Sequence, residues 1–136
     1  MAIKFPSDAW IKKLSRLLSA SESYAQSAKD WEGDFTFIVE GDNVYPRTHY
    51  LFLGLYHGKS TGGMEMQTLE EKPAEYVIKA PYSTWRKVIE GKIDPIQGMM
   101  TKQLKLTGNM MKIMRYPQAA KEIMACTQQI ETDFGG

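Results

Sequence analysis

Residues 81–114 decide the fold, and they read PYSTWRKVIEGKIDPIQGMMTKQLKLTGNMMKIM. Ser83 or Thr84 is expected to open a short amphipathic helix, and Gly91 is expected to end it. Asp94 supplies an N-cap for a second short helix, and the proline behind it suits the first helical turn. The stretch therefore predicts two short helices in succession.

A strand and a third helix are predicted to follow. Residues 103–107 alternate polar and apolar, Gly108 breaks the pattern, and Asn109 can cap a helix that begins with methionines. Six of the nine methionines lie between Met99 and Met124. Methionine is flexible and polarizable, so such a surface suits a cavity for an apolar guest. Methionines at helical spacing are equally consistent with an ordinary core.

In order and residue types this segment resembles the sterol carrier protein type 2 family. The resemblance rests on Trp85, Gly91-Lys92, Asp94, Met99-Met100 and Leu104-Lys105-Leu106-Thr107-Gly108-Asn109. The chain departs from the family pattern at Lys102-Gln103, where Gly-Lys is usual, and at Asn109, where Asp is usual. Asparagine caps a helix about as well as aspartate, so the fold is not put in doubt. The specific match covers roughly the last 45 to 50 residues, and before Pro81 only the order of elements agrees.

The composition is that of an ordinary globular protein, and residues 1–136 are expected to form a single domain. The chain has 43% hydrophobic and 24% charged residues, without an apolar run that approaches the ~18 residues of a membrane span. The first residues lack a secretory apolar region, which predicts a cytoplasmic protein. Cys126 stands alone, which excludes an internal disulfide and fits a reducing compartment.

Charge is unevenly distributed along the chain although the net charge is only +1. Between Lys79 and Lys121 nine basic residues face only Glu90 and Asp94. Solvated surface lysines explain such a pattern, and so does attraction to an anionic membrane or an acidic partner. The sequence predicts transient contact between this basic C-terminal half and anionic lipid.

The first half of the chain predicts one helix and most of a sheet. A helix after Ser7 is indicated by one apolar stripe, and its far end is less well defined. Strands are expected over residues 33–40, 48–57, 64–69 and 75–80. With residues 103–107 these give a five-stranded, mostly antiparallel sheet covered by N- and C-terminal helices. The predicted fold class is α+β.

The strand predicted over residues 48–57 is apolar on both faces. Leu51, Leu53 and Leu55 share one face, and large aromatic residues share the other. A strand of this kind belongs inside a sheet that is covered on both sides. Helices account for one cover, and the second is expected to be a partner subunit, as in a homodimer, or a bound lipid.

Motifs for catalysis, metal binding and nucleotide binding are weak. The run Gly58–Gly63 resembles the end of a phosphate-binding loop, but Leu53 stands where the first glycine is required. The run is better explained as a connection between strands. His49 and His57 would lie about 26 Å apart on one strand, too far to share a metal. The sequence therefore predicts no catalytic residue, no metal, no cofactor and no nucleic-acid partner.

The family resemblance implies that the chain binds and moves a fatty acid, fatty acyl-CoA, sterol-like lipid or phospholipid in an apolar tunnel, without catalysis. Residues from the sheet and from the helices are expected to contact the ligand. They are Phe37, Leu51, Leu53, Leu55, Trp85, Val88, Ile89, Ile96, Met99, Met100, Met110, Met111, Met114 and Ile123. Two alternatives remain: a small enzyme that acts on fatty acyl or steroid substrates, and a protein-interaction module that uses the two-sided apolar strand.

Overall fold

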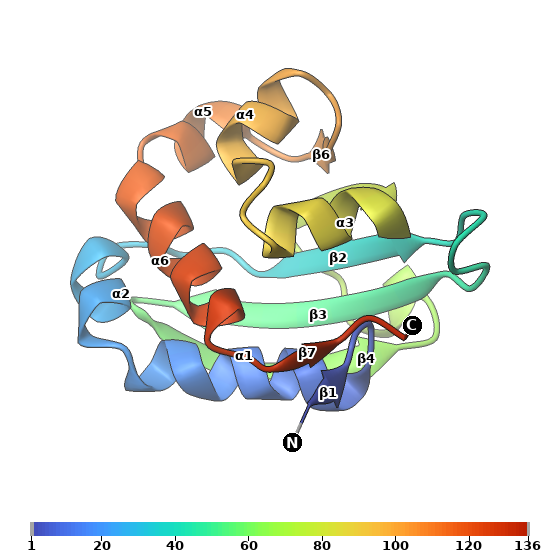
Figure 1. The fold of residues 1–136 in the computed structure, drawn as a ribbon. Coiled ribbons are helices and arrows are strands. Elements are labelled where there is room, and N and C mark those ends of the chain that lie inside the picture. Colours follow the sequence, from blue (N-terminus) through green and yellow to red (C-terminus); the bar gives the residue numbers. More distant parts are fainter. Residues whose placement is uncertain (1, 136) are drawn as a thin grey trace.

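A five-stranded sheet with helices packed on one face forms the centre of the computed structural model, which describes residues 2–135 (Figure 1). The strands lie in the order β4-β3-β2-β5-β6. β2 pairs with β5 in parallel, and the other neighbours pair antiparallel. The α+β class and the mostly antiparallel sheet are thus confirmed. The strands are β2 (Phe35–Glu40), β3 (His49–Tyr56), β4 (Lys59–Met66), β5 (Tyr76–Pro81) and β6 (Lys105–Thr107).

Helices come from both ends of the chain and cover the same face of the sheet (Figure 1). They are α1 (Asp8–Ala20), α2 (Glu22–Ser27), α3 (Tyr82–Ile89), α4 (Pro95–Met100), α5 (Met110–Met114) and α6 (Pro117–Gln128). The predicted caps of two of them are confirmed. Asp94 accepts a hydrogen bond from the Gln97 amide at 2.9 Å, and Asn109 accepts one from the Lys112 amide at 3.3 Å.

The glycine-rich run after β3 is part of a strand, which corrects the prediction of a connection there. β4 begins at Lys59, and the turn before it consists of His57 and Gly58, both with positive φ. The strand ends at Met66, although the sequence placed it over residues 64–69. Glycine is needed within the strand because a Cβ on Gly63 would lie 2.8 Å from the Ile11 carbonyl oxygen. The missing side chain lets α1 approach the edge of the sheet.

Helix α3 begins at Tyr82, earlier than the sequence predicted, and its cap comes from a distant loop. Pro81 occupies the N-cap position and has no side chain that can accept a hydrogen bond. Asp42, between β2 and β3, takes over this role: its Oδ2 accepts from the Ser83 amide at 2.9 Å and the Ser83 hydroxyl at 2.6 Å. Its Oδ1 accepts from the amides of Val44 and Tyr45. No local pattern in the sequence indicates this long-range cap.

The two ends of the described chain are joined by a small parallel sheet that the sequence did not predict. It consists of β1 (Ile3–Lys4) and β7 (Thr132–Asp133). The Trp10 indole N–H donates to the Thr132 hydroxyl at 3.1 Å, and the Tyr82 hydroxyl donates to the Phe134 carbonyl oxygen at 2.6 Å. We call this pairing, with its two side-chain bonds, the terminal clasp. It fixes the end of α6 against α1 and α3.

The outer face of β3 is covered by the protein itself at Phe52 but not at Tyr56, which exposes 53% of its surface. Phe52 is only 3% exposed, and the Lys72 ammonium lies 4.8 Å from the centre of its ring. Lys72 follows the short 3-10 helix η1 (Leu69–Glu71), which lies between β4 and β5. The partner subunit or lipid that the sequence analysis expected on this face is thus not needed at Phe52, whereas at the exposed Tyr56 that expectation stays a prediction.

The Asp42 cap predicts a pH-dependent contribution to stability. Burial raises the pKa of this carboxyl, but the hydrogen bonds from Ser83, Tyr45 and Val44 outweigh burial and hold it at about 2. Because the folded pKa lies below the ordinary value of 3.8, the stabilisation is full above about pH 4 and is lost as the pH falls through about 2.

We expect Asp42→Asn to lower the free energy of unfolding by about 1 kcal/mol at pH 7. Both carboxylate oxygens of Asp42 accept hydrogen bonds. In asparagine the amide NH₂ would replace one of these acceptors and would face an N–H or O–H donor. The matched control is Asp30→Asn, at an exposed carboxylate. Urea melts should show the difference between Asp42→Asn and the parent shrinking towards zero between pH 4 and pH 2. A difference that stays constant over this range would contradict the assignment.

A candidate ligand cavity between the sheet and the helices

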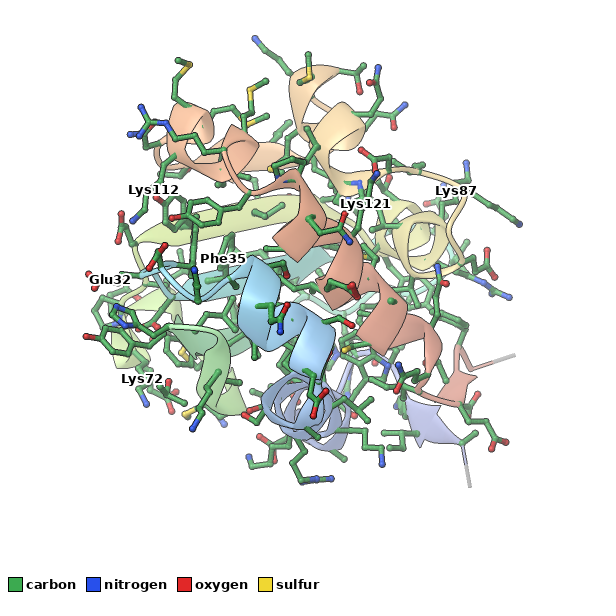
Figure 2. All side chains as sticks on the ribbon, turned by 90° about the vertical axis from the view of Figure 1, so that its left-hand side faces the viewer. Glu32, Phe35, Lys72, Lys87, Lys112 and Lys121 are labelled. Carbon is green, nitrogen blue, oxygen red and sulfur yellow. The ribbon has the colours of Figure 1, made fainter. Side chains whose placement is uncertain are left out.

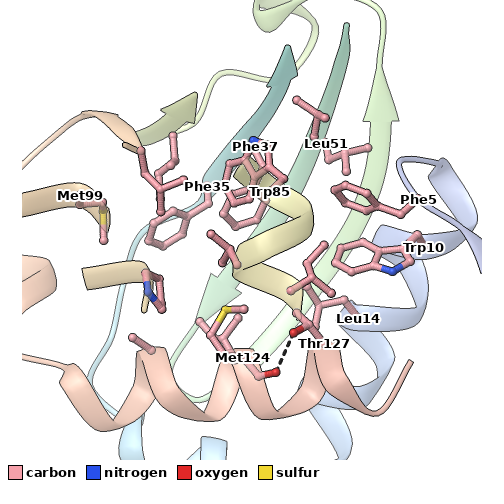
Figure 3. Close-up of a pocket in the computed structure, with 18 of the residues that line it drawn as sticks. Phe5, Trp10, Leu14, Phe35, Phe37, Leu51, Trp85, Met99, Met124 and Thr127 are labelled. Carbon is pink, nitrogen blue, oxygen red and sulfur yellow. Dashed lines mark hydrogen bonds between the residues drawn. The ribbon is translucent and has the colours of Figure 1, made fainter. Parts of the chain in front are cut away.

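An apolar cavity of about 110 Å³ lies between the inner face of the sheet and the helices that cover it (Figure 3). Strands β2, β3 and β5 form one wall, while α1, α3, α4, α5 and α6 contribute to the others. The lining residues are Phe5, Trp10, Leu14, Phe35, Phe37, Val39, Leu51, Ile78, Trp85, Val88, Ile89, Pro95, Met99, Leu104, Ile113, Ala120, Ile123, Met124 and Thr127. None of these described residues carries a charge.

The few polar side-chain atoms of the wall are already hydrogen-bonded within the protein. The Thr127 hydroxyl donates to the Met124 carbonyl oxygen at 2.6 Å, as Figure 3 shows. The Trp10 indole N–H bonds Thr132, and the Trp85 indole N–H donates to the Ile38 carbonyl oxygen at 2.9 Å. A guest inside the cavity would find no free donor among these groups, so the part of a ligand that enters must be apolar.

The exposure of the lining residues indicates that the cavity opens between α4 and α6. All but one of the lining residues that keep partial exposure lie on these two helices, namely Pro95, Met99, Ala120, Ile123 and Met124. The exception is Phe37 on β2. The remaining wall residues are buried. A ligand would therefore enter from the side where α4 and α6 meet.

Half of the residues that the sequence analysis expected to contact ligand lie on the cavity wall. Among the 14 candidates, the structure brings together Phe37, Leu51, Trp85, Val88, Ile89, Met99 and Ile123. They come from two strands and three helices. Their role in ligand binding stays a prediction, now with a common location.

The other seven candidates lie elsewhere. Leu53 is buried in the core away from the cavity, and Leu55 lines a second void described below. Five more are on α4 and α5 but off the cavity wall, namely the half-buried Ile96 and Met110 and the exposed Met100, Met111 and Met114. Helix α5 has only five residues, and among them only Ile113 reaches the wall. Of the five methionines predicted to contact ligand, only Met99 lies on the wall, and Met124, which was not among them, joins it there.

Several wall residues were missed because their signals pointed only to a general core. Trp10 and Leu14 belong to the apolar stripe of the first helix, and Phe35 alternates with Phe37 on β2. Both patterns mark an inner face but do not say which part of it borders empty space. Phe5 precedes α1, where no periodicity could identify it.

A second void of about 40 Å³ adjoins the first. The two share Phe35, Ile113, Ala120 and Ile123 in their walls, and the second is also bounded by Trp31 and Tyr116. The two spaces are therefore neighbours that share these side chains. Rotation of these side chains would let one elongated guest occupy both, since apolar voids of this kind stay dry and admit hydrophobic molecules.

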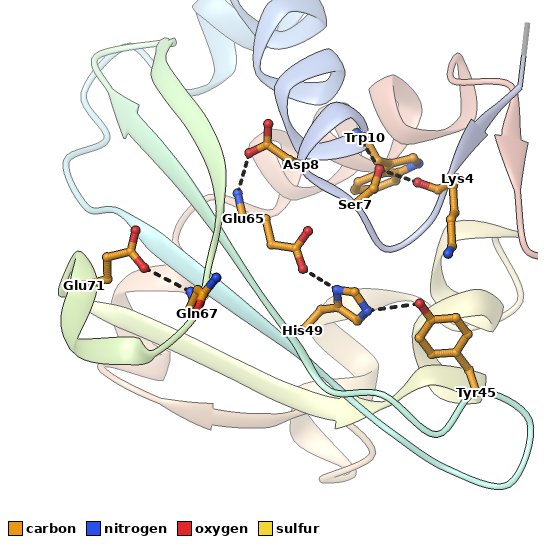
Figure 4. Close-up of polar contacts among 9 residues, drawn as sticks. All are labelled: Lys4, Ser7, Asp8, Trp10, Tyr45, His49, Glu65, Gln67 and Glu71. Atoms are coloured by element: carbon orange, nitrogen blue, oxygen red, sulfur yellow. Dashed lines mark hydrogen bonds and ion pairs between the residues drawn. The ribbon is translucent and has the colours of Figure 1, made fainter.

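A chain of polar residues that the sequence analysis missed lies near the β3–β4 end of the sheet (Figure 4). Glu65 pairs with His49 Nδ1, and His49 Nε2 is 3.1 Å from the Tyr45 hydroxyl. The Glu65 amide donates to Asp8 at 2.8 Å, which ties β4 to the first turn of α1. None of these four residues lines the cavity. The pairing of β3 with β4 brings His49 close to Glu65, while Tyr45 comes from the loop after β2 and Asp8 from α1, so no sequence motif marks the group.

Two further features bear on what the site can do. Within residues 2–135, no group of three or more His, Cys, Asp or Glu side chains is placed to hold a metal ion. No helix in the same range is long and apolar enough to cross a membrane.

The sequence matches the SCP-2 sterol transfer family over residues 11–121, and the chain therefore belongs to this family. Membership supports lipid binding or transfer in general. No curated protein sequence matches the chain.

Solved structures show the same fold. Sterol carrier protein 2, in a crystal structure, is 31% identical, with a TM-score of 0.82 over 91% of this chain and 97% of its own. A conserved hypothetical protein from Thermus thermophilus, in a solution structure, is 30% identical, with a TM-score of 0.83 over 92% of this chain and 88% of its own. Sterol carrier protein 2 from Yarrowia lipolytica, in its apo form, is 20% identical, with a TM-score of 0.60 over 88% of each chain.

Filling the cavity from α6 should separate ligand binding from stability. Ala120 lines both voids, so we expect Ala120→Phe to lower the affinity for a fluorescent fatty acid at least about tenfold. The free energy of unfolding should change by less than about 1 kcal/mol, because the ring enters existing space. Ala125→Phe, at an exposed position on the same helix, is the matched control. Unchanged affinity in a folded Ala120→Phe variant would show that the ligand binds elsewhere.

Proposed function

We propose that the chain binds one hydrophobic lipid in the cavity and transfers it without catalysis. The ligand class is a fatty acid, fatty acyl-CoA, sterol-like lipid or phospholipid. The observation that carries this proposal is the apolar cavity itself, whose polar side-chain atoms are all bonded within the protein. Family membership supports the same function in general terms.

The driving force for uptake is removal of an apolar chain from water. Each buried methylene contributes about 0.8 kcal/mol, so ten would give roughly 8 kcal/mol before the cost of ordering the ligand is subtracted. None of the described side chains on the wall is free to hydrogen-bond a head group. The polar end is therefore expected at the opening between α4 and α6, where solvent and exposed bases such as Lys121 are available.

This arrangement favours selection by the size and shape of the apolar part over selection by the head group. The voids on either side of Phe35 suit an elongated chain that extends from the opening towards Trp31. A continuous apolar tunnel is a finer proposal, supported by the wall residues that the two voids share. We also propose an intracellular, reducing setting, supported by the single buried Cys126.

The enzyme alternative has one specific feature in its favour. The Glu65–His49–Tyr45 chain joins a carboxylate, an imidazole and a phenol, groups that serve in acid–base chemistry. Its residues are absent from the cavity wall, so a bound acyl chain and these groups would not meet. We interpret the chain as a structural link between β3, β4 and the loop after β2.

The interaction-module alternative keeps only part of the feature that suggested it. Phe52, on the second face of β3, is buried by the segment that carries Lys72. Tyr56, on the same face, exposes 53% of its surface, so a protein partner or a homodimer contact there stays a prediction.

Lipid should accompany the protein through purification. We expect extraction with organic solvent, followed by mass spectrometry, to recover molecules with long apolar chains or rings and with varied head groups. The Ala120→Phe variant should carry markedly less lipid than the Ala125→Phe control. Recovery of no lipid from the parent, together with no displacement of a fluorescent fatty acid, would refute the proposed function.

Catalysis should be absent. Purified protein is expected to hydrolyse acyl-CoA no faster than buffer, and His49→Ala should leave fatty-acid affinity unchanged because the residue is outside the cavity. Hydrolysis that disappears in His49→Ala or Tyr45→Phe would instead establish an enzyme.

A further inference from the structure

Three methionines are unusually exposed at one edge of the molecule. Met100, Met111 and Met114 expose 57%, 69% and 44% of their surface. They belong to α4 and α5, which lie next to each other at the same edge in both views (Figures 1 and 2). Figure 2 shows methionine sulfurs, in yellow, projecting from this edge into solvent. We call these three residues the methionine cap.

The cap lies in the longest stretch of the chain without acidic residues. From Pro95 to Lys121 there is no Asp or Glu. The bases of this segment include Lys102, Lys105, Arg115 and Lys121, which we call the basic rim. All four are exposed, and none has an ion-pair partner within residues 2–135. Exposed apolar side chains on a segment that also carries unpaired bases complement an anionic bilayer, which offers phosphates at its surface and hydrocarbon beneath.

The cap also adjoins the opening of the cavity. Met99, on the wall at that opening, immediately precedes Met100, and Ile113, also on the wall, lies between Met111 and Met114. Lys121, on the basic rim, is next to Ala120 in the sequence, at the opening. A surface that rests on the cap would therefore lie beside α4 and α5, which carry wall residues of the cavity.

We propose that the methionine cap and the basic rim dock the protein on anionic membranes, with the cap inserted among the lipid chains. Docking itself is inferred only from the exposure of the methionine cap and the charge of the basic rim. Only its consequence, direct passage of lipid from bilayer to cavity, rests on the proposed function. The contact with anionic lipid that was expected of the whole basic half is thereby assigned to two short helices and four bases.

The test is sedimentation of the full chain with vesicles of phosphatidylcholine, either pure or containing phosphatidylserine. The parent should bind the anionic vesicles, and binding should weaken between low salt and ~0.5 M salt as charges are screened. Met111→Asp with Met114→Asp should reduce the partition coefficient at least about tenfold, because a carboxylate is repelled by the surface and resists insertion. Each exposed base contributes about fivefold to the partition coefficient on anionic vesicles. The double variant Lys102→Glu with Lys105→Glu should therefore reduce this coefficient at least about tenfold.

The chain offers a matched control in Val44→Asp. Val44 exposes 69% of its surface, the same fraction as Met111, but it lies in the loop between β2 and β3. This variant should bind vesicles like the parent. All variants should displace fluorescent fatty acid in vesicle-free solution like the parent, which separates failure of docking from failure of the cavity.

Several results would overturn the proposal. Full vesicle binding by Met111→Asp with Met114→Asp, or an equal loss in Val44→Asp, would show that the cap does not dock. Equal binding to pure phosphatidylcholine would remove the role of the basic rim. The parent could instead sediment as a dimer, dissociate when the aspartates are introduced, and fail to bind vesicles. This result would make the cap an interface between two copies.

Discussion

Helix α6 spans the inner face of the sheet, which borders the cavity, yet its main contacts are with helices α1, α2, α3 and α4. The cavity depends on this arrangement, because a helix seated directly on the sheet would fill the space beneath it. Atoms that border a void lose dispersion contacts on one side. Interactions at the edges must therefore hold α6 in place. The terminal clasp does so at one end, where Trp10 and Tyr82 bond the segment that follows the helix.

Elements whose sequence signals lie within a few residues were predicted better than contacts between residues far apart in the chain. Asp94 and Asn109 cap helices that begin immediately after them, so their signals are contained in a few residues. The cap of α3 comes from Asp42, which is 41 positions from its partner Ser83, and only the folded sheet brings the two together. The terminal clasp likewise joins opposite ends of the chain. The glycines of β4 were misread because their purpose, the close approach of α1, is tertiary.

The cavity could be predicted only in part, for a related reason. Alternation along β2 and β3 identifies the inward face, and it correctly placed Phe37 and Leu51 on it. Helices α4 and α5 have six and five residues, too few for apolar spacing to show which side faces inward. In α5 four of five residues are apolar, and the fold alone decides that Ile113 points in.

The unfilled space beneath α6 also has a mechanical meaning. Unfolding eliminates internal voids, and the accompanying decrease in volume makes a protein sensitive to hydrostatic pressure. The empty chain should thus be soft under compression, and a lipid that fills the space should stiffen it. Ligand that binds only the folded state also raises stability by mass action. With lipid in the cavity as proposed, the resistance of this protein to pressure and heat would report how much lipid its surroundings supply.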